Sequence, residues 1–166
     1  MNSLALFSKT GISSGVSQDV ILIFLIIFFG FLLGMLIGRH RLISVLINIY
    51  VSLAIVKVFP IDFFPEGESR AVIFLLLVAG LTVFGKKLFD IYISGSGTGF
   101  LWRVFVMSFL EVVLLVSILL SFLPKSVALE WVSENAYQYL VADWWSLIWM
   151  IAPMVLLLVI HRRIHR

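Results

Sequence analysis

The sequence contains no cysteine, and only 13% of its residues are charged. The lack of cysteine excludes a disulfide, a thiolate metal site and a cysteine nucleophile. By contrast, 62% of the residues are hydrophobic and the mean hydropathy is +1.16, whereas a soluble domain is about 45–50% apolar. Because the excess lies in long runs, it predicts helices that face lipid rather than a large soluble core.

The motifs of common enzymes are also missing. The chain has no G-x-S-x-G, Walker A or H-E-x-x-H sequence. The segment SGSGTG at residues 94–99 looks like a phosphate loop but lacks the following Lys-Ser/Thr pair, so we interpret it as a hinge or loop. Glu111, Asp90 and the histidines are expected at different depths. We therefore predict no enzymatic activity and no cofactor.

The histidines do not predict a metal site. His161 and His165 are four residues apart, a spacing that can bind a metal ion on a helix. The neighbouring Arg162, Arg163 and Arg166 repel a cation and attract lipid phosphate, so this segment is interpreted as a basic membrane anchor. The remaining basic residues are scattered at the edges of apolar runs, so no nucleic-acid partner is predicted.

The apolar runs predict an all-α polytopic membrane protein with about five transmembrane or re-entrant helices. The helices are expected at residues 19–38, 42–59, 71–85, 100–123 and 144–160. The third run is short, although snorkelling of Lys86 and Lys87 would let it continue to Ile93. The fifth run is interrupted by Pro153. Residues 1–18 are predicted to be a flexible tail, followed by a single membrane domain at residues 19–166.

The segment from Pro124 to Asp143 is predicted to form one amphipathic helix in the membrane interface. Trp131 or Val132 is expected to be buried toward lipid or protein. Polar residues four positions apart form one stripe on this helix and are expected to be exposed: Glu130, Glu134 and Gln138.

Basic residues are distributed unevenly between the connections. The first hairpin tip, the loop after the third run and the C-terminus hold two or three each: Arg39, Arg41, Lys86, Lys87, Arg162, Arg163 and Arg166. The connections between them, and the N-terminal tail, hold one each. This alternation predicts an N-terminus outside the cell, a C-terminus in the cytoplasm, and lipid headgroups beside the basic residues.

A glycine face is expected on the first helix. Gly30, Gly34 and Gly38 are four residues apart, so they share one side of the helix and allow another helix to approach closely. The spacing does not choose between the second helix, the fourth helix and another subunit as the partner.

Two polar residues are expected inside apolar runs. An ionised carboxylate in mid-span is costly, so Glu111 is expected to be protonated, paired or facing water. Handling of protons or cations is one interpretation. We favour a single interhelical hydrogen bond or pair that fixes packing, because Glu111 has no partner motif. Asn48 is expected to bond across to another helix rather than to line a pore.

The order of these features carries a family resemblance. Asp19 opens the first helix, Gly34-x3-Gly38 and an arginine follow, and the second helix begins Leu42-x3-Leu46. A Gly/Ser/Thr break then precedes a long fourth helix. Between residues 19 and 123 the chain thus resembles the CvpA-like family, the colicin V production proteins of the bacterial inner membrane.

The resemblance implies an inner-membrane protein linked to toxin export or envelope homeostasis, with no established enzymatic activity. Family members have small residues along the fourth helix, so close packing of that helix is not expected in this chain. The large or charged residues at those positions are Trp102, Arg103, Phe105, Met107 and Phe109.

The leading hypothesis is a structural or assembly subunit that packs against protein partners or against itself in the membrane. The alternative is a small-solute or ion transporter or channel. That function would require Glu111 and Asn48, with or without Arg103, to converge on one water-filled cavity.

Overall fold

The computed structural model describes residues 14–37, 41–59, 67–84 and 98–164, and within these ranges the chain forms seven α-helices. Their order along the chain is α2 (Ser14–Ile37), α3 (Leu42–Val58), α4 (Gly67–Phe84), α5 (Thr98–Phe122), α6 (Lys125–Trp131), α7 (Glu134–Val141) and α8 (Asp143–Ile164). A helix satisfies its own backbone N–H and C=O groups, which explains why uninterrupted apolar runs adopt this structure.

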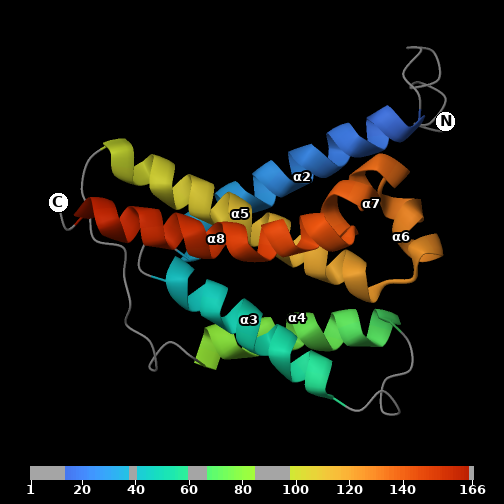
Figure 1. Ribbon diagram of the computed structural model, residues 1–166, viewed down its shortest axis with the longest axis horizontal. Coiled ribbons are helices and arrows are strands. Elements are labelled where there is room, and N and C mark those ends of the chain that lie inside the picture. The colour runs from blue at the N-terminus through green and yellow to red at the C-terminus, as the bar shows by residue number, and fades with distance from the viewer. Residues whose placement is uncertain (1–13, 38–40, 60–66, 85–97, 165–166) are drawn as a thin grey trace.

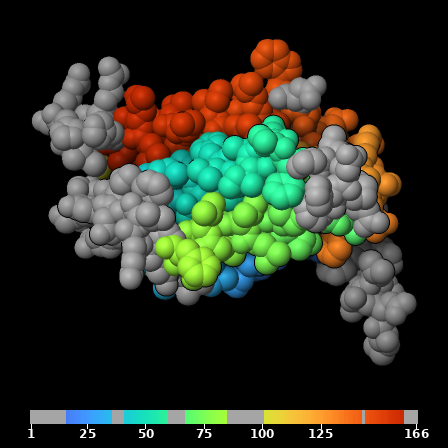
Figure 2. Space-filling view, turned by 90° about the horizontal axis from the view of Figure 1, so that it is seen from below, coloured from blue at the N-terminus to red at the C-terminus, as the bar shows by residue number. Residues whose placement is uncertain are grey.

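Helix α5 is the central element of the bundle. It contacts α2, α3, α4, α7 and α8 (Figure 1). Helices α3 and α4 lie side by side on one face of the molecule, which they share with α8 (Figure 2). Half of the residues of Leu101–Phe122 are buried, against 11% of Val16–Met35 in α2. The two longest apolar helices therefore have different roles, because α5 organises the interior whereas α2 is peripheral.

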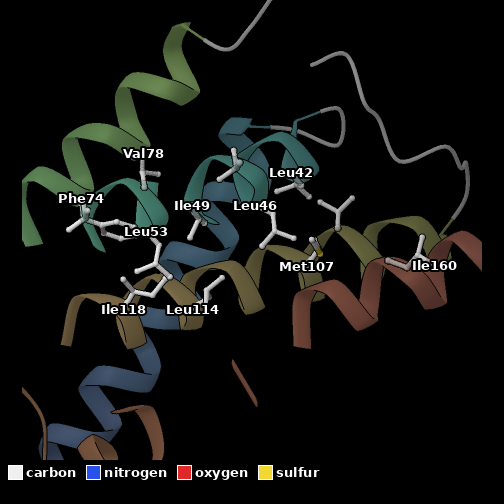
Figure 3. Packing of buried hydrophobic residues seen from close by; sticks show 13 residues of the cluster. Leu42, Leu46, Ile49, Leu53, Phe74, Val78, Met107, Leu114, Ile118 and Ile160 are labelled. Atoms are coloured by element: carbon white, nitrogen blue, oxygen red, sulfur yellow. The ribbon is translucent and has the colours of Figure 1, made fainter. Parts of the chain in front are cut away.

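Two apolar clusters hold the helices together. The first joins α3, α4, α5 and α8, and its side chains point toward one another (Figure 3). Phe74 of α4, Ile49 of α3 and Leu114 of α5 are completely buried there. The second cluster joins α2 and α5 to α6 and α7, with Ile26, Val113 and Ala128 among its buried members. Because α5 contributes to both clusters, it is buried on most of its circumference.

The helix ends form two groups (Figure 1). The ends of α2, α4 and α8 lie toward the same end of the bundle as the starts of α3 and α5. The short helices α6 and α7 lie toward the opposite end, with the starts of α2 and α8. The long helices thus alternate in direction along the bundle.

The predicted helix bounds are close for the second and fourth helices, which the structure places at Leu42–Val58 and Thr98–Phe122. The first helix begins at Ser14, so residues 14–18 are helical rather than part of a flexible tail. Helix α4 begins at Gly67, before the predicted Ala71, and Glu68 in its first turn is favourable for the helix dipole. The predicted extension of this helix to Ile93 lies outside the described residues.

The prediction of one helix between Pro124 and Asp143 is wrong, because the segment forms two short helices, α6 and α7. Val132 is extended, and the Ser133 side chain accepts a hydrogen bond of 3.1 Å from the backbone N–H of Ala136. Ser133 is thereby the N-cap of a new helix, a role that serine favours. Exposure was predicted correctly, since Glu130, Glu134 and Gln138 are exposed and Val132 is buried.

Three described helices are long and apolar enough to cross a membrane, at Val16–Met35, Gly67–Phe84 and Leu101–Phe122. A fourth candidate span results if α7 and α8, which meet at an angle of 56°, are counted together as one broken span. Helix α3 has 17 residues, or ~26 Å at 1.5 Å per residue, against a hydrocarbon core of ~30 Å. Length and composition therefore support membrane association, and the five-span arrangement stays a prediction.

Candidate functional site

The glycine face of α2 lies against α5. A Cβ atom added at Gly30 would lie 3.3 Å from the Cα of Phe109, and one at Gly34 would lie 3.1 Å from the Oγ of Ser108. The two backbones approach closely because neither glycine carries a side chain. Of the partners left open by the sequence, the structure selects the fourth predicted helix. Gly38 lies outside the described residues.

Ser108 is the small residue of α5 that sequence reasoning missed. It is fully buried and contacts the Gly34 position, between the large residues Met107 and Phe109. The expectation that α5 is not closely packed is therefore wrong, because one small side chain and the glycines of α2 suffice for close approach. The signal in the sequence was the lone serine among large residues, three positions before Glu111.

An apolar groove of about 260 Å³ runs beside this contact. Its walls come from both helices and include Gly30, Phe31, Gly34 and Phe105. Phe31 is 55% exposed at this place, so the groove opens to the surroundings of the bundle. One edge of the contact between α2 and α5 is therefore accessible from outside the bundle.

Glu111 lies in the interior of the bundle. Its exposed fraction is 0%, and neither carboxyl oxygen has a hydrogen-bond partner among the described residues. Helical periodicity puts it on the face of α5 that also carries Met107 and Leu114, which belong to the first apolar cluster. The favoured prediction of an interhelical hydrogen bond or pair is wrong for the described residues, because neither carboxyl oxygen has a hydrogen-bond partner there.

Tyr50 of α3 makes a polar contact between helices that the sequence did not reveal. Its hydroxyl donates a hydrogen bond to the backbone carbonyl of Met150 in α8. Met150 lies in the turn before Pro153, whose ring removes an N–H donor from the helix. Tyr50 thus adds a hydrogen bond where proline weakens the helix, as neighbouring side chains commonly do in membrane helices.

Asn48 makes the contact expected of it. Its Nδ2 donates to the Oγ1 of Thr82 across the α3–α4 interface, at 3.3 Å. This bond joins α3 to α4, whereas the Tyr50 hydrogen bond joins α3 to α8. Asn48 thus has a partner in Thr82, whereas Glu111 has none among the described residues.

Polar contacts also hold the short helices in place. The Ser117 hydroxyl of α5 donates to the Leu140 carbonyl of α7 at 2.6 Å, and the Trp149 indole of α8 donates to the Tyr139 carbonyl at 2.8 Å. The ion pair between Lys125 and Glu134 is exposed on both sides, so it contributes little to stability.

The structure describes only some of the basic residues that were predicted to lie beside lipid headgroups. Arg41 is exposed immediately before α3. The backbone of Arg162 and Arg163 is helical at the end of α8, and their side chains are outside the description. The remaining predicted headgroup residues lie outside the described ranges: Arg39, Lys86, Lys87 and Arg166.

The side chains that the structure describes contain no group of three or more His, Cys, Asp or Glu residues able to hold a metal ion. Comparisons with protein-family models, with curated proteins and with solved structures give no match. The site is thus defined by its own geometry: a close helix contact with a groove, and a buried carboxyl on α5.

Proposed function

We propose that this chain is a small multi-pass protein of the bacterial inner membrane that acts as a structural or assembly subunit of an envelope or export-related complex, as its resemblance to the CvpA-like family implies. The observation that carries the proposal is the groove beside the contact between α2 and α5. In lipid, helices associate through close van der Waals contact and a few polar bonds, and glycine faces permit that contact.

The peripheral position of α2 supports the same proposal. Its packing is mainly with α5, and most of its remaining surface consists of exposed large apolar side chains. Phe24 and Phe31, for example, are 66% and 55% exposed. Lipid covers such a surface, and a partner helix can replace lipid at the groove without exposing polar groups.

The alternative of a solute transporter has weaker support from the contacts. It was predicted to need Glu111 and Asn48 in one cavity, whereas Asn48 bonds to Thr82 of α4 and Glu111 has no hydrogen-bond partner among the described residues. Glu111 is surrounded on its own helix face by Met107 and Leu114, both fully buried. These contacts favour packing over a pathway that both polar residues line.

The topology belongs to the proposal as well. The grouping of helix ends in Figure 1 supports an arrangement with Arg41 and the end of α8 on the same side. Single cysteines in this cysteine-free chain test it with an impermeant thiol reagent on intact cells. We expect labelling at Glu130→Cys and none at Arg166→Cys until the membrane is opened. External labelling at Arg166→Cys would overturn the five-span topology.

Photo-crosslinking tests the assembly function. A photoreactive phenylalanine analogue at position 31 lies in the groove, and the same analogue at Phe24 lies two helical turns away with similar exposure. In native membranes we expect position 31 to give a protein adduct of one defined mass and position 24 to give several-fold less. Lipid adducts alone at position 31 would contradict the assembly function, and the mass of an adduct distinguishes a second copy from another protein.

A further inference from the structure

The short helices α6 and α7 lie at the end of the bundle where α8 starts (Figure 1). Two long helices give the distance from there to the opposite end. The helix from Trp144 to Arg162 in α8 rises ~27 Å, and that from Arg103 to Phe122 in α5 rises ~29 Å. Both lengths match a hydrocarbon core of ~30 Å. With the arginines at one membrane interface, α6 and α7 therefore lie at the level of the other.

Hydrogen bonds hold α7 against both long helices. The carbonyl of Leu140 accepts from the hydroxyl of Ser117 in α5, and the carbonyl of Tyr139 accepts from the indole of Trp149 in α8. The ring of Tyr139 also packs edge-to-face against Trp145, with ring centroids 5.3 Å apart. Helices α6 and α7 and the first turn of α8, residues 125–146, thus form an elbow that is fixed at this end of the bundle.

Three large amphipathic side chains of the elbow are more than half exposed: Trp131, Tyr139 and Trp144. Within the described part of the chain, the indoles of Trp131 and Trp144 donate no hydrogen bond, whereas the indole of Trp149 is used internally. Such rings are enriched at membrane interfaces, where the apolar body meets acyl chains and the polar end meets lipid oxygens. The lipid interface thus supplies both environments that these side chains need.

The aromatic side of the elbow continues the apolar surface of α8. Leu147 and Ile148, in the next turn of α8, are exposed large apolar side chains that lipid covers. Glu134 and Tyr139 are five positions apart on α7, which puts them about 140° apart around its axis. One side of α7 can therefore face lipid while the acidic side faces water.

Charge decides which lipids suit this surface. The described charged side chains of the elbow are Lys125, Glu130 and Glu134. Lys125 pairs with Glu134 at 3.1 Å, which leaves the carboxylate of Glu130 without a balancing cation. Anionic headgroups are attracted by clusters of Lys and Arg, and the elbow has no such cluster among its described side chains. Neutral or zwitterionic headgroups are therefore the complementary partner.

We propose that the elbow is a lipid-docking surface that binds the carbonyl and headgroup layer of a zwitterionic bilayer leaflet, with Trp131, Tyr139 and Trp144 as its anchors. The two indole N–H groups donate to lipid carbonyl or phosphate oxygens, and the rings cover the upper part of the acyl chains. Glu130 remains in water. This inference goes beyond the assembly function and does not depend on it, because a single chain would dock in the same way.

Depth-dependent fluorescence quenching of the full chain in phosphatidylcholine vesicles tests the proposal. The chain has five tryptophans, so variants that keep one and carry phenylalanine at the other four report each position separately. Lipid brominated near the glycerol should quench Trp131 and Trp144 at least twofold more than lipid brominated at the chain end. Trp149, whose indole is bonded internally, is the control and should be quenched less by the shallow probe. Stronger quenching by aqueous iodide, or protection from every quencher, would overturn the proposal.

A second measurement uses the wild-type chain and so does not depend on the folding of a variant. Phosphatidylcholine with a photoreactive group beside its carbonyl should give adducts on peptides from residues 125–146, as mapped by mass spectrometry. The same group at the chain end should shift the adducts to the middle of the long helices. An elbow without adducts from the carbonyl probe would refute the docking surface.

The charge of the lipid partner has its own control. Replacing half of the unbrominated lipid by phosphatidylglycerol should leave the quenching of Trp131 by brominated phosphatidylcholine unchanged. A loss of half or more of that quenching would mean that anionic lipid displaces the zwitterionic lipid, which would contradict the proposed partner.

Discussion

Replacement of Gly30 by leucine is expected to separate α2 from α5 and to lower the stability of the protein in detergent by about 1–3 kcal/mol. A Cβ at Gly30 meets the backbone of Phe109 at 3.3 Å, and backbone atoms cannot rotate away. A Cβ at Gly34 meets the Ser108 side chain at 3.1 Å, which can rotate, so Gly34→Leu is expected to cost less than Gly30→Leu. Both changes should reduce the photo-crosslinking of position 31 in the groove to a protein partner.

Gly80 supplies the matched control for this prediction. It lies in α4, and a Cβ added there would have no atom within 4 Å. Gly80→Leu should therefore leave stability almost unchanged, and Gly80→Ala should raise it by up to about 1 kcal/mol because alanine favours the helix. Thermal unfolding in one detergent, followed by circular dichroism, compares the variants. If Gly30→Leu were as stable as Gly80→Leu, or less harmful than Leu33→Ala, the glycine face would not be the organising contact of α2.

The helices could be predicted from the sequence because each long apolar run specifies its own local structure. Leu42–Val58 and Thr98–Phe122 lie within two residues of their expected bounds. The glycine face of α2 was also visible as a spacing of four residues. Its partner was not, because the choice of α5 depends on the packing of every other helix around it.

The contact between α3 and α8 could not be predicted for a related reason. Tyr50 and Met150 are 100 positions apart, and no local pattern indicates that their helices meet. The break between α6 and α7 was missed because the stripe of Glu130 and Glu134 suggested one continuous helix. Ser133 between them is a favourable N-cap, and that local signal outweighs the stripe.

Gly67 is the glycine whose replacement is expected to have the second large effect, and no sequence pattern singles it out. It is the first residue of α4 and lies against the last residue of α5. A Cβ atom at Gly67 would lie 2.1 Å from the carbonyl oxygen of Phe122, which is backbone. The backbone φ of Gly67 is not in the left-handed region, so the requirement for glycine here is steric.

Gly67→Ala should therefore force the start of α4 away from the end of α5. The shift would disturb the edge-to-face contact of Phe74 and Phe122, whose ring centroids are 5.8 Å apart. Overpacking against fixed backbone costs typically 1–3 kcal/mol, and Gly67→Ala is expected to lie at the upper end, at about 3 kcal/mol. The result is measured as a lower midpoint of thermal unfolding in detergent.

Two neighbouring substitutions separate this steric effect from a general sensitivity of α4. Glu68→Ala changes an exposed side chain in the same turn, and Gly80→Ala adds the same methyl group where space is open. Both should unfold close to the wild type or above it, whereas Gly67→Ala should unfold well below. If Gly67→Ala matched Gly80→Ala instead, the start of α4 would not be held against Phe122. Helix α4 would then be fixed to the bundle by its other contacts, which include Phe74, Val78 and the Asn48–Thr82 bond.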